Sequence, residues 1–548
     1  MTSFPTRYLV WIACIGLAVA GVAAWALLDD AGRWPVWLTG IATAFSLLGL
    51  RDFTQHKHAV LRNYPVIGHM RYLLEKIRPE IRQYFFESDK DGTPFSRDQR
   101  AIVYQRAKQQ KDSRPFGTQF DVYEDGFEWI HHSIAARSVR NDPIGLTIGG
   151  PDCVQPYRAS ILNISAMSYG SISPTAIRAL NRGAAIGGFA HDTGEGGVSD
   201  HHRRHGGDLI WEIGTGYFGC RTPDGKFDAE LFRDGARDDQ IKMVELKLSQ
   251  GAKPGRGGLL PEAKITDEIA KVRGVPQGAD CVSPPSHSTF TTPIEMMEFI
   301  ARMRELSGGK PTGFKLCIGH PWEFLALCKA MIETGITPDF IVIDGSEGGT
   351  GAAPLEFLDN VGMPLREGLL FAVNALVGAG LRDRIKVGAS GKVTTGFDIA
   401  RAMALGADWC NAARGFMFAV GCIQAQTCHT GKCPTGVTST DPTRYRAIKV
   451  VDKAERVANF HAATVASLAE LVAAAGLDDP NELRPEHFRR RTSPDDIVSF
   501  AAHFRALQPG ELLGGTDHPL FQTPWDMADA KTFKRAEPFK KPAVKEVL

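Results

Sequence analysis

The chain has 548 residues, of which 43% are apolar and 23% charged, and these proportions are ordinary for a folded globular protein. Long disorder and a small disulfide-stapled scaffold are therefore excluded. The 63 basic and 62 acidic residues give a formal net charge of +1, so the composition shows no basic excess that would point to nucleic acid. This length allows about two to four domains, or one large barrel with additions.

The N-terminal segment, residues 1–58, predicts a membrane anchor. Residues 9–28 carry no charge and are long enough to span a hydrocarbon core of about 30 Å. A second apolar run, residues 34–50, follows a short polar loop containing Asp29 and Asp30. We expect a hairpin of two transmembrane helices. There are two alternatives. The second run could lie in the membrane interface, or the two runs could form a hairpin buried in a protein core.

The basic residues around these runs set the expected orientation. Arg7 precedes the first run, and Arg51, Lys57 and Arg62 follow the second. By the positive-inside rule, both ends of the hairpin and the catalytic body then lie in the cytoplasm. The predicted location is thus the inner (cytoplasmic) membrane, with a multi-pass anchor.

The remainder of the chain divides by pattern into three parts. Residues 59–150 read as a linker or N-terminal extension without identifiable chemistry. From 151 to 460, short apolar runs alternate with helical stretches, which predicts an α/β fold with a parallel sheet, and the length suits a (β/α)₈ TIM barrel. A doubly wound sheet would want an early GxGxxG motif, and none follows a strand here. Residues 461–548 are expected to be a helical C-terminal extension packed onto the barrel.

Three cysteines form the strongest chemical signal. Cys422, Cys428 and Cys433 lie within twelve residues and are followed by Pro434. Thiolates at this spacing favour an iron–sulfur cluster, and three of them favour a three-iron cluster. A zinc site completed by His429 is the alternative. Cys410 is either a fourth ligand or a buried strand thiol.

Glycine-rich loops are expected at the ends of several strands. Residues 385–392 and 411–415 would follow two late strands, where barrels form phosphate sites from exposed backbone N–H groups. The loop at 343–354 lies just before them. Together these loops suggest a phosphorylated cofactor such as FMN. Lys315, within an apolar strand, would stabilise a negative flavin ring or form a structural salt bridge.

A cationic cluster follows another predicted strand. Lys247, Gln250 and Lys253 lie close together in the sequence, and Arg273 follows soon after. Cations with an amide suit a dicarboxylate, whereas a solvated charged face is the alternative. Glu195 adds one acid in the glycine loop DTGEGG.

With these residues in place, the chain from about 160 to 445 resembles the FMN-binding synthase domain of the glutamate synthase large subunit. The resemblance covers a little over half of the chain and implies a (β/α)₈ barrel, FMN and a [3Fe–4S] cluster on Cys422, Cys428 and Cys433. The matching motifs, in order, are SAMSYGSIS (165–173), TGEGG (193–197), QGAKPGRGG (250–258), SPPSH (283–287), GSEGGTGAAP (345–354) and CIQAQTCHTGKCPTGV (422–437).

The resemblance also implies a reaction and a set of roles. In the family, 2-oxoglutarate and ammonia give 2-iminoglutarate, which reduced FMN converts to L-glutamate with electrons delivered through the cluster. Glu195 and Lys253 then correspond to catalytic residues. The oxoacid-binding residues would be Lys247, Gln250, Lys253 and Arg273, and the FMN-binding residues Ser168, Lys315, Gly348, Gly349, Gly391 and Gly415.

The sequence departs from the family pattern at identifiable positions. Leu259 stands where the family has a glutamine, and Arg256 where it has an acid. The family's glutaminase domain is not expected here, so ammonia would be free or come from a separate subunit. The electron donor is also expected to be external.

Two other functions remain open from the sequence. One is a membrane-tethered flavin and iron–sulfur electron-transfer subunit. The other is a related FMN enzyme acting on a different oxo or imino acid, such as an N-alkylglutamate synthase.

Overall fold

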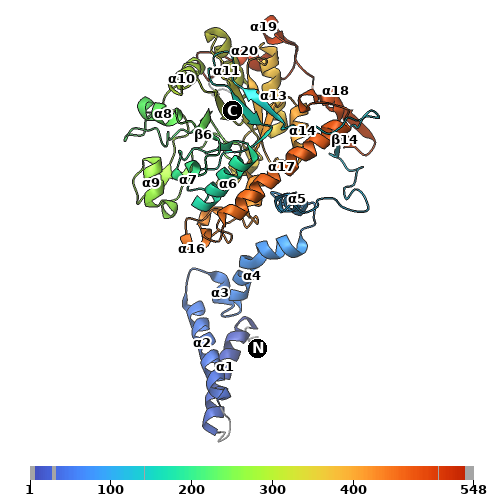
Figure 1. Ribbon diagram of the computed structural model, residues 1–548. Helices are drawn as coiled ribbons and strands as arrows, with labels where there is room; N and C mark the ends of the chain where they lie inside the picture. The colour runs from blue at the N-terminus through green and yellow to red at the C-terminus, as the bar shows by residue number, and fades with distance from the viewer. Residues whose placement is uncertain (1–5, 28–32, 141, 504, 537–548) are drawn as a thin grey trace, which may run out of the picture. The chain divides into compact units, whose positions relative to one another are not determined.

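The computed structural model describes residues 6–27, 33–140, 142–503 and 505–536 (Figure 1). Asp29 and Asp30, in the loop expected between the two apolar runs, lie outside the described residues. The chain forms two compact units, residues 1–97 and 98–548.

The first unit is helical. A close helical hairpin forms from α1 (Leu9–Leu27) and α2 (Trp34–Thr54), followed by α3 (Ala59–Asn63) and α4 (Gly68–Ile81), and a π-helical turn (Arg82–Phe86) extends α4. Gly21 lies against Thr39, and Gly49 lies against the Trp11 ring, where added Cβ atoms would clash. Small residues at such contacts let two helix backbones approach closely.

Among the residues that the structure describes, two helices are long and apolar enough to cross a membrane by length and composition, Thr6–Leu27 and α17 (Val450–Ala474). Half of the residues in the most apolar segment of α17 are buried, whereas only 6% of those in the corresponding segment of Thr6–Leu27 are buried. The expected second span, α2, does not meet this criterion among the described residues. Its amino-acid composition is diluted by Arg51, Asp52 and several small polar residues.

The second unit is built around a closed barrel of eight parallel strands, which confirms the predicted (β/α)₈ fold. The strands are β4 (Leu162–Ile164), β5 (His191–Asp192), β6 (Leu209–Ile213), β7 (Ile241–Lys247), β10 (Thr312–Leu316), β11 (Phe340–Asp344), β12 (Lys386–Ser390) and β13 (Trp409–Ala412). They pair in sequence order, and β13 closes onto β4 through the register Asn411↔Asn163.

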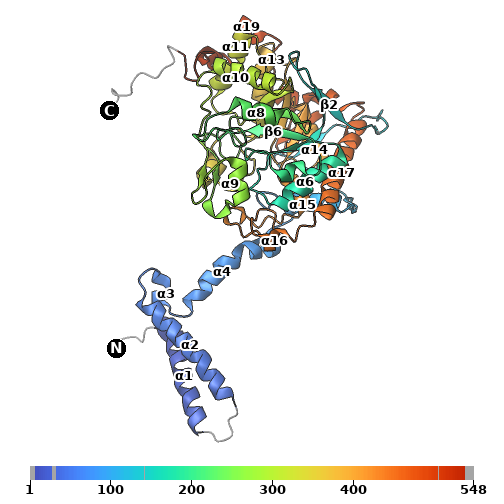
Figure 2. The ribbon, with the colours of Figure 1, turned by 60° about the vertical axis from the view of Figure 1, so that its left-hand side comes forward.

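Helices surround the barrel as Figures 1 and 2 show. Three of them begin with N-cap residues. The side-chain hydroxyls of Ser173, Thr292 and Thr395 accept hydrogen bonds from backbone N–H groups in the first turn, as N-cap residues do. The helices between and after the strands are α6 (Pro174–Gly187), α7 (Asp200–Arg203), α8 (Ala229–Ala236), α10 (Pro293–Leu306), α11 (Pro321–Thr334), α12 (Leu355–Asn360), α13 (Leu365–Gly378), α14 (Gly396–Ala404), α15 (Arg414–Val420), α16 (Pro442–Tyr445) and α17.

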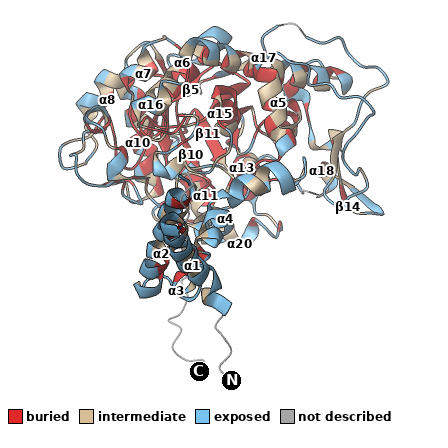
Figure 3. Ribbon diagram, turned by 90° about the horizontal axis from the view of Figure 1, so that it is seen from below, coloured by how far each residue is buried: buried red, intermediate tan, exposed pale blue. Residues whose placement is uncertain are grey.

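The barrel interior changes from apolar to polar along the strands. Phe340 and Trp409, near the strand starts, meet edge to face with ring centroids 6.0 Å apart. Further along the same strands stand Asp344 and Asn411, on the same faces because side chains alternate. Figure 3 shows the barrel strands in the buried interior of this unit, together with the inner faces of helices such as α15. The polar end is the carboxyl end, where barrel enzymes carry their sites.

An insertion between β7 and α10 lies at this carboxyl end. It contains the two-stranded antiparallel ladder of β8 (Leu259–Leu260) and β9 (Cys281–Val282), with α9 (Asp267–Arg273) between them. This insertion carries Lys253 and Arg273, two of the residues predicted to bind the oxoacid.

The segments before and after the barrel pair with each other. A hairpin of β2 (Gly145–Ile148) and β3 (Tyr157–Ser160) precedes β4, and β1 (Glu128–Ile130) pairs with β14 (Phe488–Ser493), which pairs with β15 (Asp496–Ser499). The expected C-terminal extension is therefore not purely helical. The remaining helices are α5 (Arg97–Ala107), α18 (Phe500–His503), α19 (Glu511–Gly514) and α20 (Gln522–Met527).

Candidate active site

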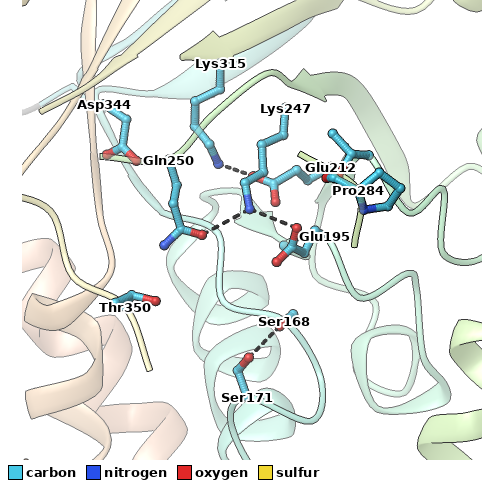
Figure 4. Close-up of polar contacts among 12 residues, drawn as sticks. Ser168, Ser171, Glu195, Glu212, Lys247, Gln250, Pro284, Lys315, Asp344 and Thr350 are labelled. Atoms are coloured by element: carbon cyan, nitrogen blue, oxygen red, sulfur yellow. Dashed lines mark hydrogen bonds and ion pairs between the residues drawn. The ribbon is translucent and has the colours of Figure 1, made fainter. Parts of the chain in front are cut away.

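The predicted oxoacid residues converge at the carboxyl ends of β5 and β7. The Lys247 ammonium lies 3.0 Å from the Glu195 carboxylate and donates to Gln250 Oε1 at 3.1 Å, as Figure 4 shows. Lys247 is the last residue of β7. Glu195 follows β5 in a loop in which Gly194 adopts a left-handed φ of 67°. The two loops thus bring an acid, a cation and an amide into direct contact, and we call this group of residues the pocket.

Lys253 and Arg273 add two further positive charges that act on Glu195. Burial raises the pKa of Glu195, but Lys247, Lys253 and Arg273 outweigh burial and lower it to about 2. Both added cations are themselves buried, with exposed fractions of 6% and 4%. The pocket therefore holds three cations and one carboxylate, an excess of positive charge that suits a dianionic ligand.

Arg273 also reaches the loop after β4. Its guanidinium donates to the Tyr169 carbonyl oxygen at 3.1 Å and lies over the Phe218 ring, 5.0 Å from the centroid. In that same loop the hydroxyls of Ser168 and Ser171 are hydrogen-bonded at 2.8 Å. Ser168, predicted to bind FMN, is thus next to the oxoacid residues.

Lys315 lies inside the barrel among carboxylates. Its ammonium contacts Glu212, is 3.0 Å from Glu245 and is 3.9 Å from Asp192. Burial disfavours its charged form, but these carboxylates raise its pKa well above the ordinary value. The salt-bridge alternative for Lys315 is therefore present, and its register partner on the neighbouring strand is Lys247.

The predicted phosphate loops meet around α15. Arg414, its first residue, donates to the Thr350 carbonyl oxygen at 2.6 Å and has no ion-pair partner in the described part of the chain. A Cβ added to Gly349 would lie 2.6 Å from the Arg414 guanidinium. Gly348 in the same loop, Gly391 after β12 and Gly415 beside Arg414 complete the predicted set. An unpaired guanidinium among glycine loops fits a phosphate group.

The three predicted cluster cysteines are neighbours in space. Burial raises the pKa of Cys422, and Cys428 and Cys433 add to this effect. Burial also disfavours the Cys433 thiolate, but hydrogen bonds from Thr435 and Thr438 outweigh it, so its pKa is lowered.

Cys410 does not belong to this group. It lies on β13 with Leu162 of β4 as its register partner and is completely buried. Burial raises the pKa of its thiol. It is therefore the buried strand thiol of the two alternatives.

Lys264 joins the cluster loop to the loop after β4. Its ammonium donates to the Cys428 carbonyl oxygen at 3.4 Å and to the Ser171 carbonyl oxygen at 3.3 Å. The sequence analysis did not identify this residue. In the sequence, Lys264 is a single lysine within the β7–α10 insertion and cannot be distinguished from a surface lysine. In the structure only 5% of it is exposed.

Sequence reasoning also missed His287 of the SPPSH motif. Its ring nitrogens lie 2.8 Å from the Lys247 carbonyl oxygen and 3.1 Å from the Tyr217 hydroxyl. Burial lowers its pKa to about 4, so the ring is neutral at pH 7. It positions the end of β7 and thereby Lys247.

A separate cavity of about 810 Å³ opens behind the segment Leu248–Gly255. It is lined mainly by apolar residues from the loops after β7, β10 and β11, and Phe533 of the C-terminal extension contributes to its wall. None of the predicted site residues lines it. The cavity is distinct from the pocket around Lys247.

The structure thus combines a parallel barrel, a cation-rich pocket at its carboxyl end and a nearby group of three cysteines. Barrel enzymes carry their active sites on the loops at this end of the barrel. Residues 153–478 match the conserved region in glutamate synthase. The chain belongs to the glutamate synthase family.

Similar proteins extend this assignment. The chain is 40% identical over 495 residues to the glutamate synthase large subunit-like protein YerD of Bacillus subtilis, covering 83% of this chain and 94% of that protein. It is 31% identical to a glutamate synthase large subunit-like protein of Rhizobium meliloti, covering 65% and 79%. The archaeal-type glutamate synthase [NADPH] of Thermotoga neapolitana is 33% identical, covering 58% of this chain and 60% of that enzyme.

Proposed function

We propose that the chain is an FMN-dependent oxidoreductase that reductively aminates 2-oxoglutarate to L-glutamate. The observation that carries this proposal is the pocket in which Lys247, Lys253 and Arg273 face a single carboxylate, Glu195. A dianionic oxoacid balances the excess of two positive charges. Membership of the glutamate synthase family supports the same reaction.

The residues fit the flavin that this family implies. Arg414 and the glycine loops would hold the phosphate, with Ser168 and Gly348 nearby. Lys315 would belong to the same set, with its ammonium held by Glu212 and Glu245. Bound FMN supplies hydride transfer, while the chain binds the oxoacid, orients it and keeps Glu195 ionised beside Lys247.

The residues also fit an iron–sulfur cluster. Cys422, Cys428 and Cys433 would hold it, with Thr435 and Thr438 hydrogen-bonded to Cys433 and the Gln424 N–H donating to Cys422 Sγ at 3.4 Å. Such bonds tune cluster potentials. Its role would be to pass electrons from an external donor, and ammonia would come from solution or a separate subunit.

We further propose that α1 and α2 anchor the protein in the cytoplasmic membrane. Both helices expose large apolar side chains, including Trp25 (66%), Trp34 (53%) and Trp37 (70%). Tryptophans near the hairpin tip are typical of membrane interfaces. Protein recovered in the membrane fraction and released by detergent but not by high salt or carbonate supports the anchor. Release by salt alone would refute it.

The function is tested by anaerobic reoxidation of the reduced holoprotein. We expect 2-oxoglutarate plus ammonium to reoxidise the flavin and to yield L-glutamate. Faster reoxidation with alkylamines would favour an N-alkylglutamate synthase, and no reoxidation with either would favour the electron-transfer subunit.

Two variants test the assigned residues. Lys253→Ala should abolish oxoacid-dependent reoxidation and retain FMN, whereas Lys271→Ala, on the exposed side of α9, should do neither. Cys428→Ser should remove the cluster signal in electron paramagnetic resonance, whereas Cys410→Ser should keep it. Normal turnover of Lys253→Ala would place the oxoacid site elsewhere.

A further inference from the structure

Five ionisable side chains share the barrel interior beside Lys247 (Figure 4). Lys315 contacts Glu212, Glu245 and Asp192, and each of the four is at most 3% exposed. Asp344 joins them from β11, where its carboxylate accepts the Gly251 N–H at 2.8 Å. Figure 4 shows Lys315, Glu212 and Asp344 beside Lys247 and Gln250. We call these five residues the interior cluster.

The charges of the interior cluster do not balance when all five groups are ionised. One ammonium faces four carboxylates, which leaves three negative charges in excess. Lys247, the nearest cation along β7, is already paired with Glu195, and no other cation is paired with these carboxylates in the described ranges. Burying uncompensated charge is strongly unfavourable, so buried carboxylates take up protons instead.

The position of Lys315 also decides against a metal ion at this place. Oxygen atoms of Asp192, Glu212 and Glu245 lie within 4.8 Å of one another, which is a spacing that a cation could use. The Lys315 ammonium already supplies that cation. The excess acidity of the cluster is therefore available for protons.

We propose that the interior cluster is a proton store: it holds at least one exchangeable proton at neutral pH and delivers it to the nitrogen of the product in each turnover. The second half of this statement rests on the proposed function. The reaction 2-oxoglutarate + NH₄⁺ + 2e⁻ + 2H⁺ → glutamate + H₂O consumes two protons. One enters the C2–H bond together with the two electrons, and the other ends on the amino group. The cluster supplies the second and regains a proton from water.

The electrostatics and the strand geometry support this role. Burial and the neighbouring Glu212 raise the pKa of Glu245 to about 7 although Lys315 opposes them, and burial raises that of Asp192 and Asp344. Coupled carboxyls of this kind share protons as a group. Lys315 and Lys247 are register partners. A Cβ on Gly214, two residues after Glu212, would meet the Glu195 side chain at 2.8 Å, so the chain just after β6 lies against Glu195.

The store itself is tested by infrared spectroscopy of the resting holoprotein, without turnover. We expect a carboxylic acid C=O band that shifts in D₂O, persists above the range where exposed carboxyls ionise, and loses intensity near pH 7. Glu245→Gln and, as a second variant, Asp192→Asn should weaken this band. Glu195→Gln should leave it unchanged, because that carboxyl is ionised. Absence of the band from the unsubstituted protein, or an unchanged band in both cluster variants, would overturn the proposal.

Delivery of the proton is tested by single-turnover reoxidation. General acid catalysis contributes about 10²–10⁴-fold, so Glu245→Gln should slow reoxidation by 2-oxoglutarate and ammonium about 100-fold while its affinity for 2-oxoglutarate is retained. Unchanged rates would refute delivery. If the unsubstituted protein does not react with 2-oxoglutarate, the proposed function fails, whereas the infrared band still decides whether the cluster holds protons.

Discussion

Replacing Lys315 by methionine tests the electrostatic reasoning most directly. Methionine keeps most of the length of the side chain and removes the only ammonium that is paired with the interior carboxylates within the described part of the chain. Breaking a buried ion pair by removing one partner costs about 3–5 kcal/mol, because the other partner remains buried and uncompensated. In a domain of this size, residues 98–548, a loss of that magnitude corresponds to a fall in Tm of roughly 3–5 °C.

The cost should depend on pH in a defined direction. The pKa values of Glu245, Asp192 and Asp344 are raised above those of an unfolded chain. A group with a raised pKa contributes stability that is present below its unfolded pKa and is lost as the pH rises through its folded pKa. Without Lys315 these folded pKa values rise further. The loss of stability should therefore be larger at pH 8 than at pH 5.

The assay is thermal unfolding of the full-length protein in detergent at the two pH values. Lys329→Met is the matched control, because Lys329 donates to the carbonyl oxygens of Trp525 and Ala528 and not to carboxylates. Its loss should be similar at pH 5 and pH 8. An equal loss for Lys315→Met at both values, or no loss, would show that the interior carboxylates do not depend on this ammonium.

Three further perturbations have defined outcomes. Glu195→Gln should lower kcat about 100-fold at every pH from 5 to 9, because a pKa of about 2 keeps the carboxylate ionised throughout; a loss confined to one end of this range would contradict that assignment. Lys264→Met should shift the cluster signal in electron paramagnetic resonance without removing it, and an unchanged spectrum would separate Lys264 from the cluster. Gly49→Leu should reduce the folded fraction recovered after heating in detergent, because its side chain meets Trp11, whereas Gly16→Leu, which points into open space, should not.

The alternation of strands and helices was sufficient to predict the barrel, because each βα unit carries its own local signal. The motif residues Glu195, Lys247 and Gln250 were also recognisable, since glycine-rich loops with polar side chains stand out after apolar strands. Their convergence needed the closed barrel. Sequence spacing alone could not show that the loop after β5 meets the end of β7.

The interior carboxylates were harder to foresee. Glu212 lies in LIWEI and Glu245 in MVELK, and both strands are buried on both faces, so neither shows the simple alternation of a half-exposed strand. A single acid in such a strand could equally point toward a helix. Only the register that pairs Glu212 with Glu245 and surrounds Lys315 shows that they share one interior.

The pairing of β1 with β14 was missed for another reason. These strands lie more than 350 residues apart in the sequence, and β14 reads as FRRRTS, whose arginines are atypical of a strand. Glu128 accounts for one of these arginines, because it forms an ion pair with Arg490. It also pairs with Arg366 and Arg401, and only 5% of its side chain is exposed. A buried acid fixed by basic residues from distant segments cannot be recognised before the tertiary fold is known.

Charge is separated along the barrel axis in a way that links binding to proton transfer. The pocket at the strand ends carries an excess of positive charge on Lys247, Lys253 and Arg273, and the interior cluster beside it carries an excess of acids. A dianionic oxoacid is attracted to the pocket and repelled from the interior. Its negative charge in turn favours the protonated form of the carboxyls beside it. We therefore expect that binding of an oxoacid beside Lys247 would increase the protonated fraction of the interior carboxyls, so that the proposed substrate selection and the proposed proton supply would rest on the same charge separation.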